Sequence, residues 1–232
     1  MKTLVITGAS KGIGLAVAGL CLEEDYSVIN LSRSPAPDAR IDNLPIDFAS
    51  PEAEVELAEM LKTRLTPGEI VLVHNAARLN NDRTDETSTA DFRDVMAVNL
   101  TGPHLVNQLV IPFMQSGSSI IYVGSTLSEK AVANAYTYVV SKHAMIGMMR
   151  ATCQDLAGRG IHTACVCPGF TDTEMLRAHV GEDPEILKAI ASMSTFDRLV
   201  TPGEIATTIK FAADNQVLNG AVIHANLGQK ES

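Results

Sequence analysis

Short apolar runs alternate with longer stretches of helical periodicity along almost the whole chain. The apolar runs predict buried strands at residues 4–6, 27–31, 44–46, 70–73, 119–123, 161–166 and 221–225. Between them, apolar residues recur at helical spacing and predict helices at residues 13–24, 51–65, 90–114, 136–157 and 203–213. Strands that alternate with helices form a sheet covered on both faces, so we expect a doubly wound α/β fold with seven mostly parallel strands.

The stretch from residue 170 to residue 198 departs from this rhythm. It is helical in pattern and rich in apolar residues, and the sequence Gly181-Glu182-Asp183-Pro184 divides it into two short helices. Its apolar side chains could line a pocket or could pack on the core, which is the usual role of an apolar helical stripe. No repeat or linker interrupts the chain, and we therefore predict one domain over residues 1–232.

A glycine-rich turn follows the first predicted strand, with the sequence Thr7-Gly8-Ala9-Ser10-Lys11-Gly12-Ile13-Gly14. The glycines stand between a strand and a helix, which is the setting that a dinucleotide-binding turn requires. Glycine lets the backbone approach a pyrophosphate, and the free N–H groups at the helix start attract its charge. The spacing is G-x-x-x-G-x-G, and a tight turn without a ligand is the alternative interpretation.

Tyr138 and Lys142 form the second candidate site, with Ser125 thirteen residues before the tyrosine. Residues four apart share one face of a helix, so the lysine ammonium can lie beside the tyrosine hydroxyl. A nearby cation favours the phenolate, and we therefore expect a lowered pKa for Tyr138. Such a tyrosine can exchange a proton with a substrate near neutral pH.

These motifs together resemble the short-chain dehydrogenase/reductase family, in its short single-domain form, over nearly the whole chain. The family's catalytic Ser, Tyr and Lys match Ser125, Tyr138 and Lys142, and its catalytic Asn matches Asn99 within Val98-Asn99-Leu100-Thr101-Gly102. Its glycine motif and its Pro-Gly motif with a following threonine match Gly8, Gly12, Gly14, Pro168, Gly169 and Thr173. The resemblance implies a Rossmann-type fold, with residues 170–198 covering the substrate.

The resemblance also implies a role for each matched residue in the interconversion of a carbonyl and an alcohol. Tyr138 would act as the acid or base, Ser125 would hold the carbonyl oxygen, and Lys142 would grip the nicotinamide ribose. Asn99 would hold a water that relays protons to Lys142, and Thr173 would fix the carboxamide. The implied cofactor-binding set is Gly8, Ser10, Lys11, Gly12, Ile13, Gly14, Ser32, Arg33, Asp47, Asn75, Ala76, Tyr138, Lys142, Pro168, Gly169 and Thr173.

The end of the second predicted strand bears on the choice of cofactor. Many dinucleotide folds place an acid there to hold the ribose 2′-hydroxyl, whereas this chain has Ser32 followed by Arg33. The guanidinium of Arg33 suits a 2′-phosphate, and Lys11 adds a second cation. We therefore favour NADP(H), with NAD(H) as the alternative if both cations are ordinary solvated charges. Asp47 resembles the residue that bonds the adenine amino group.

Three places depart from the family pattern. His74-Asn75-Ala76-Ala77 replaces Asn-Asn-Ala-Gly, and Ala77 would be strained if its position needed a positive φ. Ala225-Asn226-Leu227-Gly228 replaces the usual Asp-Gly-Gly ending. Cys167 precedes Pro168 where asparagine is common. None of these changes removes a catalytic group.

Composition limits the classes of partner. The net charge of −9 and the 4% aromatic content argue against a nucleic-acid partner, which would need a basic surface and stacking platforms. No apolar run reaches the 18 residues of a membrane span, and no basic leader precedes the first strand, so we expect a cytoplasmic protein. The four cysteines form no C-x-x-C pair and the six histidines do not cluster, so we expect no metal site.

We therefore predict an NADP(H)-dependent oxidoreductase that acts on a small carbonyl or alcohol. The resemblance further implies a homo-oligomer, a tetramer or a dimer, that pairs through the helices at 90–114 and 136–157. A dinucleotide sensor without turnover is one alternative, although the intact Ser125, Tyr138 and Lys142 set argues against it. A relative that epimerises or dehydrates its substrate is another, but such chains generally carry a larger C-terminal part.

Overall fold

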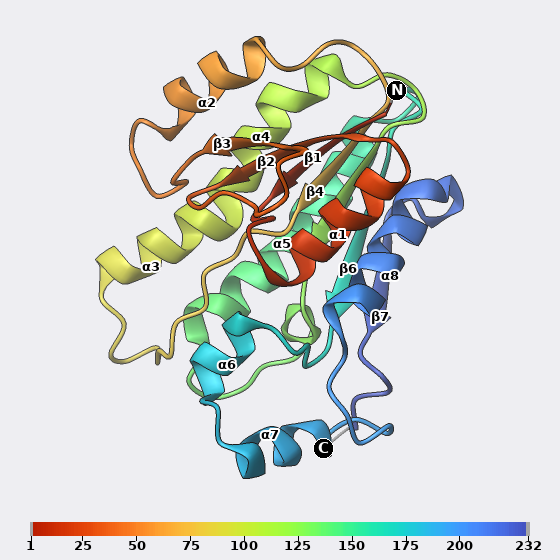
Figure 1. Cartoon of the computed structure of the whole chain (residues 1–232). Coiled ribbons are helices and arrows are strands. Elements are labelled where there is room, and N and C mark those ends of the chain that lie inside the picture. Colours follow the sequence, from red (N-terminus) through yellow and green to blue (C-terminus); the bar gives the residue numbers. More distant parts are fainter. Residues whose placement is uncertain (1, 231–232) are drawn as a thin grey trace.

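Seven parallel strands form one continuous sheet in the computed structural model, which describes residues 2–230 (Figure 1). Their order across the sheet is β3-β2-β1-β4-β5-β6-β7. The strands are β1 (Thr3–Thr7), β2 (Ser27–Ser32), β3 (Ile41–Pro45), β4 (Ile70–His74), β5 (Ser119–Val123), β6 (His162–Pro168) and β7 (Ala221–Ala225). The order reverses between β1 and β4, so their carboxyl ends border the crevice where doubly wound sheets bind ligands. The predicted α/β class and strand count are confirmed.

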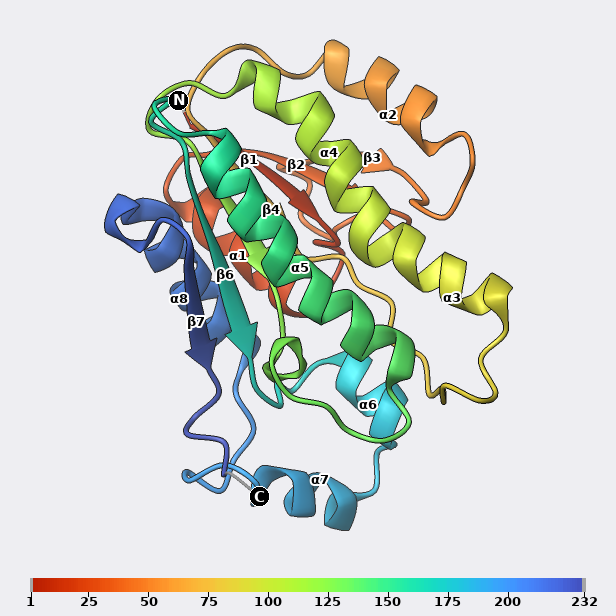
Figure 2. The same cartoon turned by 180° about the vertical axis from the view of Figure 1, so that it is seen from behind.

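Helices cover both faces of this sheet. The helices are α1 (Gly12–Glu23), α2 (Ala53–Lys62), α3 (Thr89–Met96), α4 (Gly102–Val110), α5 (Tyr136–Asp155), α6 (Glu174–Val180), α7 (Pro184–Ala191) and α8 (Pro202–Asp214). α1 and α8 lie side by side on one face, and α4 and α5 lie on the other (Figures 1 and 2). The inner strands β1, β2, β4, β5 and β6 are therefore buried on both sides, which explains why they read as continuous apolar runs.

The helix predicted at residues 90–114 is wrong as a single regular helix. α3 is followed by a π-helical turn at Ala97–Thr101, then by α4 and a 3₁₀ turn at Ile111–Phe113. The Asn99 side chain sits in the π turn and bonds both the backbone of Arg78 and the hydroxyl of Ser141. These bonds to other parts of the chain hold the wider turn, and π turns of this kind are common at functional sites.

Two smaller boundaries also differ from the sequence prediction. The helix predicted at 51–65 spans only Ala53–Lys62, and Pro51 lies in the turn before it. The strand predicted at 44–46 runs instead over Ile41–Pro45, because five consecutive residues pair with β2 from Val28 to Ser32. Polar Asp42 and Asn43 hid this strand from a prediction based on apolar runs.

The segment 170–198 lies beyond the carboxyl end of the sheet and contains α6 and α7 (Figure 1). Gly181 separates the two helices with a φ of 89°, a conformation that glycine adopts without strain. Neither helix has a buried residue. The division into two short helices therefore follows the sequence prediction, whereas their packing on the core is slight.

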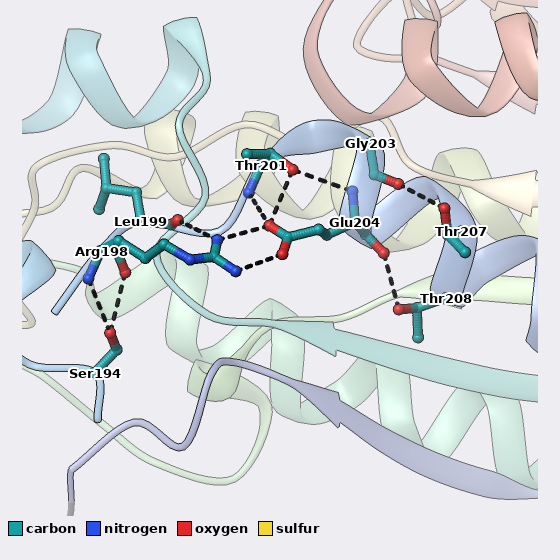
Figure 3. A network of polar contacts seen from close by, with 8 residues as sticks. All are labelled: Ser194, Arg198, Leu199, Thr201, Gly203, Glu204, Thr207 and Thr208. Atoms are coloured by element: carbon teal, nitrogen blue, oxygen red, sulfur yellow. Dashed lines mark hydrogen bonds and ion pairs between the residues drawn. The ribbon is translucent and has the colours of Figure 1, made fainter. Parts of the chain in front are cut away.

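Two attachments hold the far end of this segment. Arg198 pairs with Glu204, which also caps the start of α8 through the backbone N–H and the hydroxyl of Thr201 (Figure 3). The chain after β7 returns to the segment, where Lys230 N donates to the Met193 carbonyl at 2.7 Å and Thr195 N to that of Leu227 at 3.2 Å. The segment is thus fixed at its end even though its helices bury little.

Candidate active site

A cleft of about 660 Å³ opens at the carboxyl edge of the sheet. It extends from the glycine-rich turn past the ends of β2, β4 and β5 to α6. Ser125, Tyr138 and Lys142 line it together with most of the predicted cofactor residues: Gly8, Ser10, Lys11, Gly12, Ile13, Ser32, Arg33, Asp47, Asn75, Ala76, Pro168, Gly169 and Thr173. Gly14 and Asn99 do not line it.

The glycine-rich turn has a shape that side chains would destroy. Gly8 and Gly12 adopt φ angles of 74° and 58°, in the region that favours glycine. A Cβ on Gly14 would lie 2.3 Å from the carbonyl oxygen of Gly8, so Gly14 serves the close packing of the turn. Asn75 crosses from β4 and donates from Nδ2 to the carbonyl oxygens of Thr7 at 3.1 Å and Gly8 at 2.9 Å.

The start of α1 and its surroundings fit the phosphates of a dinucleotide. Lys11 occupies the N-cap, and its side chain makes no capping hydrogen bond to the free N–H groups of the first turn. Such a helix start attracts anions. Arg33 is exposed at the cleft, and the ion pairs within residues 2–230 include neither Arg33 nor Lys11. Both cations are therefore available to a ligand.

Ser125 is held at the end of β5 by a small turn. It is the N-cap of a 3₁₀ turn at Thr126–Ser128, and its Oγ accepts from Leu127 N at 3.1 Å. Ser128 Oγ in return accepts from Ser125 N at 3.1 Å. This reciprocal capping fixes the backbone of Ser125 beside Tyr138, and both residues line the cleft.

The Lys142 ammonium lies over the Tyr138 ring and is also bound to a backbone carbonyl. Its Nζ lies 5.4 Å from the centre of the Tyr138 ring and donates to the carbonyl oxygen of Val123 at 2.6 Å. Lys142 is also 1% exposed, and burial lowers its pKa to about 8.

The predicted lowering of the Tyr138 pKa is wrong for this structure. Burial raises the pKa of Tyr138 to about 12, and the nearby Ser125 hydroxyl opposes that rise only in part. Desolvation of the phenol is the largest cause of this rise. The phenol is therefore protonated at neutral pH.

Asn99 is fully buried, and its side-chain amide binds other parts of the chain. Its Oδ1 accepts from Arg78 N at 2.7 Å, and its Nδ2 donates to the Arg78 carbonyl at 3.0 Å and to Ser141 Oγ at 2.9 Å. Ser141 in turn donates to the carbonyl of Tyr138 at 2.8 Å. The amide is engaged by protein groups, and its contacts brace the turn of α5 that carries Tyr138.

Thr173 connects the cleft to the segment 170–198. It is the N-cap of α6, with its Oγ1 accepting from Leu176 N at 3.3 Å, and its methyl lies 3.4 Å from where a Gly12 Cβ would stand. The covering segment therefore begins in contact with the glycine-rich turn.

The comparisons with known proteins agree with this geometry. A family model described as enoyl-(acyl carrier protein) reductase matches residues 8–230. The chain belongs to the short-chain dehydrogenase/reductase family.

An uncharacterized oxidoreductase of Thermotoga maritima is 31% identical over 248 residues, which cover 98% of this chain and 96% of the relative. The 3-oxoacyl-(acyl-carrier-protein) reductase FabG of Vibrio cholerae is 28% identical, over 98% of this chain and 96% of the relative. The solved structure of ElxO with NADP bound is 28% identical with a TM-score of 0.85, over 97% of each chain. The chain is thus an oxidoreductase of a family that transfers hydride.

The departures from the family pattern leave the backbone at β4 unstrained. Ala77 is not among the residues with positive φ, so its methyl costs no backbone strain. Leu227, in the altered ending, does adopt a positive φ of 52°. The positive φ that we considered for Ala77 is therefore found at Leu227 instead, where the chain turns back to Thr195.

Two buried clusters of this dehydrogenase/reductase were missed in the sequence. His74, Asn107, Tyr122 and Thr152 form a continuous hydrogen-bonded chain between β4, α4, β5 and α5. The sulfurs of Cys165 and Cys167 lie 3.8 Å apart, and a Cβ on Gly124 would come within 2.8 Å of both. The shared face of the two cysteines was visible in the sequence, whereas their contact with the residue before Ser125 depends on the sheet register.

The cleft is also lined by residues outside the predicted catalytic and cofactor-binding sets. They include four apolar and two polar side chains: Leu127, Val132, Met175, Leu176, His179 and Gln229. Three of these six lie in the segment 170–198, whose apolar side chains we considered as a possible pocket lining. No group of three or more His, Cys, Asp or Glu residues within 2–230 is arranged to hold a metal ion. No helix in the same range is both long and apolar enough to cross a membrane.

Proposed function

We propose that this protein is an NADP(H)-dependent oxidoreductase that interconverts a small carbonyl compound and its alcohol, with Tyr138 as the acid and base. The observation that carries the proposal is a single cleft that Ser125, Tyr138 and Lys142 line at one end and the glycine-rich turn lines at the other. A bound nicotinamide would supply or accept the hydride. The protein would bind both reactants, orient them and move one proton.

In the direction of reduction, Tyr138 gives its proton to the oxygen of the carbonyl as negative charge develops there. The raised pKa of Tyr138 keeps the phenol in the protonated form that this step requires. Ser125 donates a hydrogen bond to the same oxygen, and a donor placed at a developing oxyanion is a large contributor to catalysis. The reciprocal capping of Ser125 and Ser128 means that this donor needs little reorganisation.

Lys142 and Asn99 support this proton transfer without donating the proton themselves. The Lys142 ammonium over the Tyr138 ring stabilises the phenolate that remains after the proton has left. Asn99 acts through Arg78 and Ser141 to hold the first turns of α5, so we assign it a positioning role within the predicted catalytic set.

Arg33 supports the choice of NADP(H) over NAD(H). It stands exposed directly after Ser32, which ends β2 at the position where an acid would otherwise accept the ribose 2′-hydroxyl. Replacing Arg33 with Asp removes the partner of a 2′-phosphate and supplies a partner for a 2′-hydroxyl. We expect the ratio of the NADPH and NADH dissociation constants to invert in the Arg33→Asp variant. A wild-type protein that binds NADH more tightly would contradict the assignment.

The experiment that tests the proposed reaction is a screen of ketones, aldehydes, sugars and acyl thioesters, following the loss of NADPH absorbance. Wild-type protein should oxidise NADPH with at least one carbonyl class, and the Ser125→Ala variant should lose most of that rate. NADPH binding without turnover across all classes would favour a dinucleotide sensor instead.

We also propose that the protein is a homo-oligomer, a tetramer or a dimer, that pairs through α4 and α5. Val140 on α5 is 36% exposed, whereas Met145 and Met149 on the same helix are buried against the sheet. The apolar surface available for pairing is therefore smaller than the sequence of α5 suggests. Light scattering at micromolar protein would contradict the proposal if it gave the mass of one chain.

A further inference from the structure

We propose that Asn30 and Asn43 form an amide relay that positions the loop carrying Arg33 against the glycine-rich turn, and so set the preference for a dinucleotide with a 2′-phosphate. This inference rests on the proposed use of NADP(H). It adds two residues that lie in the sheet, away from the cleft surface, to the groups that determine cofactor choice.

The relay is a continuous series of hydrogen bonds across the β2–β3 pair. Ala9 N, in the glycine-rich turn, donates to Asn30 Oδ1 at 2.9 Å. Asn30 Nδ2 donates to Asn43 Oδ1 at 2.9 Å, and the same oxygen accepts from Ala36 N at 2.8 Å. Asn30 and Asn43 are direct partners in the register of β2 and β3. The series therefore connects the turn at residues 8–14 with the loop at residues 33–40.

Burial makes this arrangement specific. Asn30 is 1% exposed and Ala9 and Ala36 are 0% and 6% exposed, so an unpaired amide here would lose its bonds to water without compensation. The methyl of Ala36 packs in the same apolar cluster as Val28 and Ile41. The loop thus has one buried residue, whose N–H has a single acceptor in Asn43.

The rest of the loop has a restricted backbone, so the hydrogen bond at Ala36 also limits where Arg33 can lie. Pro35 and Pro37 flank Ala36 and restrict the backbone on each side. Further along, Arg40 pairs with Asp38 at 2.8 Å and with Glu23 of α1 at 3.2 Å. Arg33 itself makes no ion pair within residues 2–230, so its position depends on the backbone that leaves β2 and enters this loop.

The two ends of the relay act on different parts of a dinucleotide. The Ala9 end shapes the turn that meets the pyrophosphate, which NADPH and NADH share. The Ala36 end shapes the loop next to the ribose, where only a 2′-phosphate uses Arg33. Loss of the Asn43 amide should therefore weaken NADPH selectively, whereas loss of the Asn30 amide should weaken both cofactors.

The test measures dissociation constants for NADPH and NADH by calorimetry, together with amide hydrogen exchange at Ala36 in the cofactor-free protein. We expect Asn43→Ala to weaken NADPH about tenfold, the loss expected for one buried hydrogen bond, while NADH changes less than twofold. Exchange at Ala36 should rise by at least as much. Asn215→Ala is the matched control, because it removes an amide that caps the end of α8 through the Phe211 carbonyl.

Asn43→Asp separates the relay from general damage to the sheet. It retains an oxygen that can accept from both Asn30 and Ala36, so exchange at Ala36 should stay slow. Its charge would itself oppose a 2′-phosphate. For this variant we therefore compare only the amide hydrogen exchange at Ala36, and not the dissociation constants. Rapid exchange in Asn43→Ala with slow exchange in Asn43→Asp supports the relay.

The outcomes distinguish this inference from the proposed function. If the wild type prefers NADPH and Asn43→Ala keeps the same ratio of dissociation constants, the relay is overturned and the use of NADP(H) stands. Unchanged exchange at Ala36 in Asn43→Ala overturns the relay whatever the cofactor. If the wild type prefers NADH, the assignment of NADP(H) fails and the relay's role in cofactor choice fails with it.

Discussion

The two walls of the cleft are built in opposite ways. The wall formed by the glycine-rich turn is tied to β4 by Asn75 and to β2 by Asn30, and Ala9 at its centre is fully buried. The wall formed by residues 170–198 has helices without a buried residue, and Phe196 near its end is 67% exposed. A wall that is packed into the core, which we propose binds the cofactor, thus faces a wall that is held mainly at its two ends, which we propose covers the substrate and call the substrate wall. The apolar core of the fold draws on the first wall and not on the helices of the second.

The largest effect should come from filling the rigid wall. In Gly14→Ala the new methyl would meet the Gly8 carbonyl and the Asn75 amide, at 2.3 and 2.6 Å, so the turn must open. We expect a loss of about 3 kcal/mol in the free energy of unfolding and no measurable dinucleotide binding. Urea unfolding and calorimetry measure these two quantities.

Gly19→Ala is the control for that change, because a Cβ on Gly19 has no atom within 4 Å and the residue is in the middle of α1. It should raise stability by about 0.5–1 kcal/mol through helix propensity. Equal free energies of unfolding and equal dinucleotide binding in the two variants would contradict the tight packing of Gly14.

Tyr138→Phe should remove the chemistry while leaving both walls intact. Phenylalanine keeps the ring under the Lys142 ammonium and lacks only the proton donor. Turnover should fall at least about a hundredfold, because a positioned acid contributes that much, and the NADPH dissociation constant should stay within about twofold. Residual activity within tenfold of the wild type would rule out Tyr138 as the acid.

Lys142 gives a pH-dependent difference in stability. Its folded pKa of about 8 lies below its usual value of 10.5, so between these pH values the unfolded chain binds more protons and stability rises with pH. Lys142→Met, which removes this buried charge, should therefore be more stable than the wild type by about 1–3 kcal/mol at pH 7. The difference should shrink toward pH 10. Thermal unfolding of both proteins at several pH values checks the sign, and a constant difference would contradict the cause.

The smallest expected effect concerns the motion of the substrate wall. Residues 170–198 should exchange their amide hydrogens faster than β1 and β4 in the cofactor-free protein, because they bury few apolar groups. NADPH should slow this exchange through Thr173, which touches the glycine-rich turn. Exchange as slow as that of the central strands, with and without NADPH, would describe a rigid wall instead of a lid.

Most of the sheet could be predicted because strands buried on both faces leave continuous apolar runs. The predicted strand at 44–46 missed the first part of β3, because Asp42 and Asn43 in that part are polar. The π turn at Asn99 could not be foreseen, since it depends on bonds to Arg78 and Ser141 from elsewhere in the fold.

The candidate site shows the same limit. Helical spacing correctly brought Lys142 to the face of α5 that carries Tyr138. It could not show how strongly burial disfavours the charged phenolate, and so the predicted direction of the Tyr138 pKa was wrong. A spacing rule identifies neighbours on one helix, whereas the partner chosen among them depends on what the adjoining strand presents.

The way residues 170–198 are attached has a consequence for how new specificities arise. One end begins at Thr173 against Gly12, and the other is clamped by Arg198 and Glu204 at the start of α8 (Figure 3). Because this segment is fixed at its ends and its helices bury no residue, we expect that its sequence can be replaced as a unit without repacking the core. Mutation or grafting there can explore new substrates at little risk to folding, provided that both anchors are kept.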